Sequence, residues 1–227
     1  MIQTPKINLI HGDCMELMRD TPDGFYDLAV VDPEYGIDAA NMTMGSGKKK
    51  KYKKSDWDKS RPEESYFKEL MRVSVNQIIC GGNYFTDVLP PTKSWVLWDK
   101  GIYGDCSFAD GEMIWTSFDS VLRIAKIRYK GFLGADKERI HITQKPVPLY
   151  VWLLQNYAKP GDRILDTHGG SMSIAIAAFD LGFDLDLTEL NKDYYDAGVA
   201  RFERHRAQGQ LFHTPAAQLP EQQKMFE

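Results

Sequence analysis

The sequence has few cysteines, and their arrangement excludes two common kinds of site. The chain holds three, Cys14, Cys80 and Cys106, and no two of them form a Cys-x-x-Cys pair. An odd number at wide spacing argues against a disulfide scaffold and a zinc site, and it favours a reducing compartment. We therefore expect no metal ion and a cytoplasmic protein.

Long apolar runs are absent as well. No stretch approaches the ~20 apolar residues of a membrane-spanning helix, and the first residues lack the basic start and apolar centre of a signal peptide. The Gly-x-Gly-x-x-Gly pattern of dinucleotide-binding folds is missing, and so is the Gly-Lys-Ser/Thr of phosphate-binding loops. These absences count against a membrane protein, a dinucleotide-binding oxidoreductase and a P-loop enzyme.

What is present is an ordinary globular composition in 227 residues, 43% hydrophobic and 26% charged, with a net charge of −4. This length and apolar content predict one sizeable domain. We assign residues 1–207 to this domain and the polar residues 208–227 to a tail. The polar stretch at about 38–60 contains a lysine run and is expected to be a surface loop inserted in the domain.

The order of apolar segments predicts an α/β fold. Strands and helices alternate along most of the chain, which favours a Rossmann-like, mostly parallel sheet with helices on both faces. We also expect an antiparallel pair made by 112–116 and 120–127, and Met172 falls in the first turn of an expected helix. The other expected strands are 7–10, 26–31, 77–80, 94–98, 163–166 and 183–187, and the expected helices are 15–18, one starting at 62, 146–157, 171–180 and 191–205.

The loop Asp32-Pro33-Glu34-Tyr35-Gly36 follows the apolar run Leu28-Ala29-Val30-Val31. In a mostly parallel sheet, ligands bind beyond the carboxyl ends of the strands. The acid can accept hydrogen bonds, the proline fixes the backbone and leaves its carbonyl free, and the tyrosine offers a flat face. These groups suit a planar ring that carries an exocyclic amino group.

A second turn, Asp166-Thr167-His168-Gly169-Gly170-Ser171-Met172-Ser173, joins a strand to a helix. Its glycines let the backbone approach a bound molecule, and the helix start offers unpaired N–H groups. Glu189 ends the next strand, where an acid can hold ribose hydroxyls. By itself the turn is equally well a plain glycine-rich connection, but it suits a cofactor with a ribose and a carboxylate better than one with a pyrophosphate.

Four segments, in this order, resemble the DNA amino-methyltransferases, which methylate adenine or cytosine amino groups with S-adenosylmethionine. The Asp32–Tyr35 loop resembles the family's Asp-Pro-Pro-Tyr motif, and His141-Ile142-Thr143-Gln144-Lys145-Pro146 resembles its His-Pro-Thr-Gln-Lys-Pro segment. The 166–173 turn is similar to the family's Asp-x-x-x-Gly-Ser, and Thr188-Glu189-Leu190-Asn191 to its acidic ribose site. The order is that of the permuted (beta) arrangement, as in phage and mobile-element enzymes of this size.

The resemblance implies that Asp32 and Pro33 accept hydrogen bonds from the amino group, while Tyr35 stacks on a base that has left the helix. The candidate catalytic residues are therefore Asp32, Pro33, Glu34 and Tyr35. The candidate cofactor-binding residues are Asp13, Asp32, Thr143, Lys145, Asp166, His168, Gly170, Ser171 and Glu189. Asp13 is equally a helix N-cap, and the simpler interpretation of His168 is a turn residue.

Two basic stretches are the expected contacts to double-stranded DNA, because lysine and arginine neutralise phosphates. The first follows the catalytic loop, although a solvated loop is the usual place of such a run. The second opens the segment at about 126–141, where the resemblance implies target recognition, and its shortness leaves a homodimer possible. The candidate DNA-binding residues are Lys48, Lys49, Lys50, Lys51, Lys53, Lys54, Lys126, Arg128 and Lys130.

Glu34 stands where the family has a second proline, and it keeps two interpretations open. The chain is a site-specific DNA adenine methyltransferase, or it is a catalytically weak homologue that binds DNA or cofactor. Glu34 either adds a second carboxylate near Asp32 or points to solvent. Cytosine and RNA remain alternative acceptors, and Asp32, in place of serine or asparagine, favours adenine by analogy with the family.

Overall fold

An eight-stranded sheet organises the molecule, with the strand order β1-β8-β7-β2-β3-β5-β4-β6. The structure is a computed structural model that describes residues 4–37, 60–102, 109–129, 140 and 143–211. The strands are β1 (Ile7–His11), β2 (Tyr26–Val31), β3 (Ser74–Cys80), β4 (Trp95–Asp99), β5 (Gly111–Thr116), β6 (Arg123–Lys126), β7 (Arg163–Asp166) and β8 (Asp184–Glu189).

The sheet is parallel over most of its width. Strands β1, β8, β7, β2 and β3 lie side by side and run parallel, whereas β5 is antiparallel to both of its neighbours, β3 and β4. The central strand β2 is buried from Leu28 to Val31, as its unbroken apolar sequence requires of a strand covered on both faces. The predicted α/β fold with a mostly parallel sheet is confirmed.

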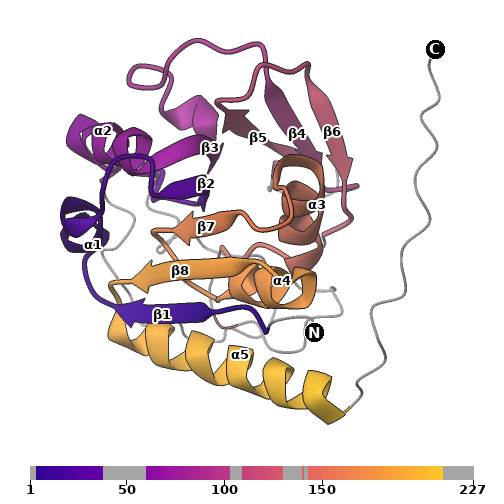
Figure 1. Cartoon of the computed structure of the whole chain (residues 1–227). Helices are drawn as coiled ribbons and strands as arrows, with labels where there is room; N and C mark the ends of the chain where they lie inside the picture. Colours follow the sequence, from indigo (N-terminus) through magenta and orange to yellow (C-terminus); the bar gives the residue numbers. More distant parts are fainter. Residues whose placement is uncertain (1–3, 38–59, 103–108, 130–139, 141–142, 212–227) are drawn as a thin grey trace.

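Helices cover both faces of this sheet (Figure 1). Successive strand residues point to opposite faces, so Leu28 and Val30 pack in one core with α3, α4 and α5, whereas Ala29 and Val31 pack in another with α1 and α2. The helices are α1 (Cys14–Asp20), α2 (Glu64–Val73), α3 (Val147–Tyr157), α4 (Ser173–Leu181) and α5 (Lys192–Leu211), and a 3-10 turn, η2, covers Gly82–Tyr84.

The antiparallel pair expected from 112–116 and 120–127 is wrong. Both segments are extended, but β5 lies between β3 and β4, so neither of its edges is available to β6. Strand β6 instead pairs with the outer edge of β4, in the parallel direction. Strands β5 and β6 are consecutive in sequence but do not pair. The two edges of β5 are already occupied by β3 and β4, so β6 pairs with the remaining free edge of β4.

The expectation that Met172 lies in the first turn of a helix is also wrong, because α4 begins one residue later, at Ser173. Met172 has a φ of 59° and is the one non-glycine residue in the left-handed region among the described residues. That conformation costs about 1–2 kcal/mol for an L-residue. Its side chain is fully buried in the core, and burying a methionine gains roughly 1.5–3 kcal/mol, which offsets the backbone cost.

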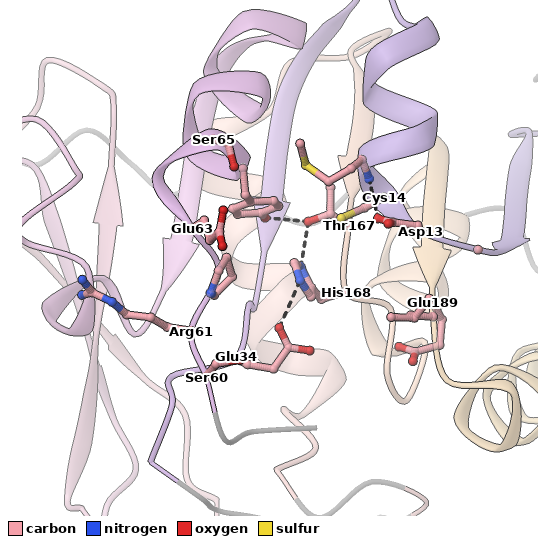
Figure 2. A pocket seen from close by; sticks show the side chains of 15 residues that line it. Asp13, Cys14, Glu34, Ser60, Arg61, Glu63, Ser65, Thr167, His168 and Glu189 are labelled. Carbon is pink, nitrogen blue, oxygen red and sulfur yellow. Dashed lines mark hydrogen bonds and ion pairs between the residues drawn. The ribbon is translucent and has the colours of Figure 1, made fainter. Parts of the chain in front are cut away.

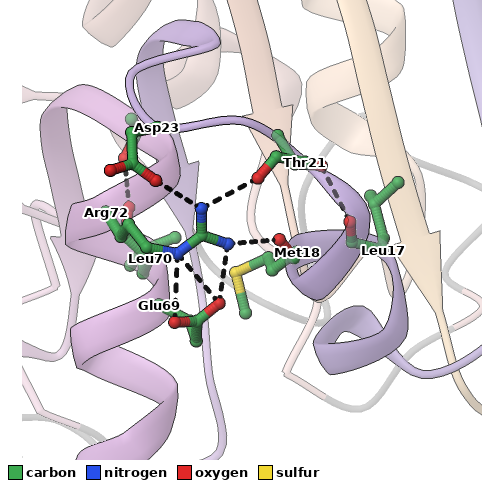
Figure 3. A network of polar contacts seen from close by, with 8 residues as sticks. Leu17, Met18, Thr21, Asp23, Glu69, Leu70 and Arg72 are labelled. Atoms are coloured by element: carbon green, nitrogen blue, oxygen red, sulfur yellow. Dashed lines mark hydrogen bonds and ion pairs between the residues drawn. The ribbon is translucent and has the colours of Figure 1, made fainter.

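Arg72 of α2 joins the two helices on its face of the sheet (Figure 3). Its guanidinium donates to the carbonyl oxygens of Met18 at 2.6 Å and Thr21 at 2.9 Å, and it forms ion pairs with Asp23 and Glu69. The carbonyl groups at a helix C-terminus have no partner within the helix and carry partial negative charge. Arg72 therefore caps α1 from a neighbouring helix and fixes its position against α2.

Candidate functional site

The carboxyl edge of the parallel strands gathers the acidic residues that the sequence singles out. Asp32 directly follows β2, Asp166 ends β7, and Glu189 ends β8. Asp13 follows β1 and caps α1, its Oδ1 accepting the Met15 N–H at 2.8 Å. The helix-cap interpretation of Asp13 is thus confirmed, and the residue also faces the cavity described next.

A pocket of about 360 Å³ opens at this edge (Figure 2). Its walls come from the starts of α1 and α2, from the chain leading into α2, and from the ends of β7 and β8. Four of the predicted site residues line it: Asp13, Glu34, His168 and Glu189. Glu63 adds a further carboxylate, so the lining is rich in hydrogen-bond acceptors.

Glu189 is held in a fixed orientation by the backbone around it. Its Oε2 accepts the Gly170 N–H and its Oε1 accepts the Asn191 N–H, each at 2.7 Å. Burial raises the pKa of Glu189, while these two donors act in the opposite direction. Each carboxylate oxygen can accept a second hydrogen bond, so the side chain can still bind hydroxyl groups in the pocket.

Asp166 does not line the pocket, and only 2% of its surface is exposed. Its Oδ1 accepts the His168 N–H at 3.0 Å. Burial raises the pKa of Asp166 to about 7, against the opposing effect of that hydrogen bond and of the His168 side chain. A nearby cation would stabilise the ionised form of this buried carboxyl group and lower its pKa.

Ser171, predicted to face the cofactor, is buried and occupied by the protein. Its hydroxyl lies 3.0 Å from that of Ser173, and its carbonyl oxygen accepts a hydrogen bond from Arg201 Nη1 at 2.7 Å. Gly170 donates its N–H to Glu189, and Thr143 is exposed. None of the three predicted residues lines the pocket. The sequence analysis did not identify Arg201, which lies in the long helix α5, as a partner of this turn.

The Asp32 carboxylate is held by two donors from the chain. Its Oδ1 accepts the Tyr35 hydroxyl at 2.8 Å and Lys145 Nζ at 2.5 Å. Lys145 Nζ also lies 3.4 Å from Glu112 Oε2, and Glu112 pairs with Lys100 at 2.7 Å. Burial alone would lower the pKa of Lys145, but Asp32 and Glu112 raise it well above its ordinary value.

Lys145 was a candidate cofactor-binding residue, and in this structure it lies between two carboxylates of the chain, Asp32 and Glu112. Glu112 and Lys100 were missed by the sequence analysis. Nothing in an ordinary strand sequence marks a glutamate as the partner of a lysine more than thirty residues away. Burial works against the charged form of Glu112, yet Lys145 and Lys100 lower its pKa overall. The side chains of Asp32, Lys145, Glu112 and Lys100 form one charged network next to the Asp32–Tyr35 loop.

The Tyr35 ring is packed against the end of β3. It stacks on the Tyr84 ring with centroids 4.7 Å apart and an interplanar angle of 14°. The ring also lies against Gly81, whose φ is +63° and where a Cβ would stand 2.3 Å from Tyr35 Cε1. Glycine is therefore required at position 81, both for the backbone conformation and for the space that the ring fills. Pro33 is buried.

Glu34 takes neither of the two positions expected for it. Its Oε2 lies 3.3 Å from His168 Nε2, so the side chain points to a histidine and not to Asp32 or to open solvent. On the other side of the ring, His168 Nδ1 lies 2.8 Å from Thr167 Oγ1, which lies 2.7 Å from the Tyr66 hydroxyl. His168 is thus more than a turn residue, since both of its ring nitrogens have partners (Figure 2).

The predicted DNA-binding residues are only partly described. Lys126, at the end of β6, and Arg128 are exposed. The lysine-rich loop and the rest of the second stretch lie outside the described residues, namely Lys48, Lys49, Lys50, Lys51, Lys53, Lys54 and Lys130.

Two searches of the described residues bear on the class of site. Within the described ranges, no cluster of three or more His, Cys, Asp or Glu is arranged to hold a metal ion. None of the helices in that part of the chain is long and apolar enough to cross a membrane.

Known proteins share both the sequence pattern and the fold. A family model described as DNA methylase, of the N6/N4 type, matches residues 38–200. The PvuII DNA methyltransferase (cytosine-N4-specific) superposes with a TM-score of 0.60 at 14% identity, over 90% of this chain and 92% of that chain. The M1.HpyAVI–SAM complex gives 0.57 at 15% identity, over 86% and 99%. A putative DNA modification methylase from Thermus thermophilus, complexed with S-adenosyl-L-methionine, gives 0.54 at 18% identity, over 87% and 93%.

Proposed function

The chain belongs to the DNA methylase family of the N6/N4 type, and from this premise we propose that it is a site-specific DNA adenine methyltransferase. It transfers a methyl group from S-adenosyl-L-methionine to the exocyclic amino group of an adenine flipped out of double-stranded DNA. One observation carries the proposal: the Asp32–Tyr35 loop and the acidic pocket share a wall, because Glu34 belongs to both.

The pocket fits S-adenosyl-L-methionine by its chemistry. Asp13, Glu63 and Glu189 line it with carboxylates, which suit ribose hydroxyls, an adenine amino group and a molecule that carries positive charge. Asp166, buried and with a raised pKa, suits the ammonium of the amino-acid end. The cofactor supplies a methyl group that its sulfonium already activates.

The protein's contribution to the chemistry is to orient and polarise the adenine amino group. Both contacts that described residues make to Asp32 fall on Oδ1, so Oδ2 is the oxygen that accepts the amino N–H. Accepting this hydrogen bond shifts electron density onto a nitrogen that is otherwise a poor nucleophile. Lys145 and Tyr35 hold the carboxylate still, and positioning and electrostatics of this kind supply most of the rate.

The same proposal assigns DNA binding to basic residues. Lys126 and Arg128 are exposed, and each phosphate contact adds affinity that salt weakens. We assign the same role to the lysines at 48–54 and to Lys130.

The decisive experiment measures the methylated base. Unmethylated genomic DNA, isotope-labelled S-adenosyl-L-methionine and the purified chain are incubated, and the DNA is digested to nucleosides for mass spectrometry. N6-methyladenine supports the proposal, and sequencing of the modified sites reports the target. Label in N4-methylcytosine assigns the chain to cytosine, the base named for its PvuII structural relative. Label only in added RNA, or in neither nucleic acid, overturns the proposal.

A catalytically weak homologue is the second candidate, and its support is Glu34 in place of the motif's second proline. Glu34→Pro separates the two. Because Glu34 pairs with His168 and leaves Asp32 to Lys145, we expect the substitution to lower transfer or leave it unchanged. A large gain in transfer would instead favour the weak homologue.

A further inference from the structure

Two unusual residues of the site meet across neighbouring strands. Glu34 lies in the loop after β2, and His168 lies in the turn after β7, which pairs with β2 in parallel. Their side chains approach to 3.3 Å between Oε2 and Nε2. An acid in the catalytic motif and a histidine in the cofactor turn are each without an evident purpose alone, but together they form one contact between the two functional loops.

The histidine is fixed by more than the glutamate. Its Nδ1 lies 2.8 Å from Thr167 Oγ1, and the chain of contacts continues to the Tyr66 hydroxyl on α2. The Tyr66 ring packs edge-on against the imidazole at 5.3 Å. Rotation of the ring would break contacts on both nitrogens, so Nε2 is aimed at Glu34.

The charges around His168 favour its protonated form. Glu34, Asp166 and Glu189 face it from the loop after β2, from β7 and from β8, and Tyr66 faces it from α2. Burial alone would lower the pKa of His168, but these three acids raise it to about 9. The imidazolium is therefore the cation that balances a group of acids at the pocket.

We infer that Glu34 and His168 are a positioning pair that locks the catalytic loop to the cofactor turn, so that the wall of the cofactor pocket and the Asp32 carboxylate are held in one arrangement. This inference rests on the proposed function. It also explains how position 34 can depart from proline: the ion pair supplies across the sheet the rigidity that a second proline would supply within the loop.

A double-mutant cycle tests the pair. Glu34→Gln, His168→Gln and the double variant are compared by calorimetric binding of S-adenosylhomocysteine and by kcat for methyl transfer. Each single variant is expected to weaken binding roughly tenfold, the low end of the loss for a hydrogen bond to a charged group. The double variant should bind no more weakly than the weaker single variant, because both remove the same contact.

Two further measurements separate positioning from mere packing. Binding by the wild type should weaken as pH rises through about 9, since the imidazolium then loses its proton. The weakening should be smaller in His168→Gln, where the ligand's own ammonium still loses its proton but no imidazolium does. His205→Gln is the matched control, because His205 pairs with Asp180 at 2.7 Å on α5 and α4, and neither residue lines the pocket. It should leave affinity and its pH profile unchanged.

The outcomes distinguish the two claims. A wild-type chain that neither binds S-adenosylhomocysteine nor transfers methyl groups overturns the proposed function. Normal binding and transfer with strictly additive substitutions, or a pH profile of His168→Gln identical to that of the wild type, overturns the positioning pair alone. If the variants do not fold, nitrogen-15 shifts of the His168 ring in the wild type decide: a doubly protonated ring at pH 7.5 supports the pair, and a neutral ring rejects it.

Discussion

Asp32 and Asp166 stand at the ends of neighbouring parallel strands, yet the protein surrounds them differently. Asp32 forms an ion pair with Lys145 at 2.5 Å and accepts the Tyr35 hydroxyl. Asp166 is more deeply buried, accepts the His168 N–H, and has its pKa raised to about 7. One carboxylate is paired directly with a lysine and oriented in advance, whereas the other accepts a backbone N–H and has its pKa raised by burial. The first suits polarising a substrate, and the second suits binding a cationic cofactor.

The most direct test of the difference between the two aspartates changes Asp32. Asp32→Asn keeps the side-chain shape but removes the anionic acceptor, and we expect kcat to fall about 10²–10³-fold, the usual loss for one electrostatic group at a reacting centre. Affinity for S-adenosylhomocysteine should change little. The control Asp119→Asn alters an exposed aspartate paired with Lys93 and should leave transfer intact. Equal losses in the two variants would contradict the role of Asp32.

Gly81→Ala disturbs the Asp32 side without touching either carboxylate. The added Cβ would overlap the Tyr35 ring, at 2.3 Å from Cε1, and alanine is strained at a φ of +63°. Displacing the ring removes a donor from Asp32, so we expect kcat to fall roughly tenfold to a hundredfold. Gly161→Ala is a useful control, because its φ is also positive but nothing lies within 4 Å of the new Cβ. It should cost stability alone.

Asp166→Asn tests the other half of the comparison. Removing the Asp166 carboxylate should weaken S-adenosyl-L-methionine binding roughly tenfold, because a charge-assisted hydrogen bond to the cofactor's ammonium is lost. Calorimetry measures this affinity. Unchanged affinity would show that Asp166 does not face the cofactor's charge.

Asp166→Asn should also change how the free energy of unfolding depends on pH. The folded-state pKa of Asp166 is about 7, above its ordinary value of 3.8, so the folded chain holds a proton that the unfolded chain releases. Stability from this group is full below the unfolded pKa and is lost as pH rises through the folded pKa of about 7, by on the order of 4 kcal/mol in total. Urea unfolding at pH 5 and pH 8 should show a smaller decline in Asp166→Asn than in the wild type.

The smallest effect is expected where neither aspartate is involved. Lys126→Ala and Arg128→Ala remove exposed charges, so each should weaken DNA binding about twofold to threefold and lower the salt slope by about 1. Binding of S-adenosylhomocysteine should be unaffected. A salt slope that does not change in either variant would place the DNA elsewhere.

Much of this site was predictable from short-range patterns. A strand followed by an acid locates Asp32, Asp166 and Glu189 at one sheet edge, because parallel strands share a carboxyl end. The N-cap role of Asp13 follows from the residues just after it. Such inferences need only the chain within a few residues and the direction of the strands.

The features that the sequence analysis missed are contacts between distant residues. The partner of Glu34 is 134 residues away, and Glu112 meets Lys145 only because β5 is inserted between β3 and β4. The same insertion made the expected β5–β6 pair wrong. Met172 was wrongly placed in a helix. Its left-handed conformation is stabilised by burial in the tertiary structure, and no local sequence pattern indicates that.

Arg72 links the stability of α1 to that of α2. Helix α1 has only seven residues, too short to persist by itself in water, and its last carbonyl groups depend on a guanidinium from α2. The two helices line the pocket with Cys14, Met15, Ser65 and Tyr66, and we expect them to unfold together as one cooperative unit. Their amide protons should then exchange with solvent at a common rate, so this wall of the pocket would be lost or kept as a whole.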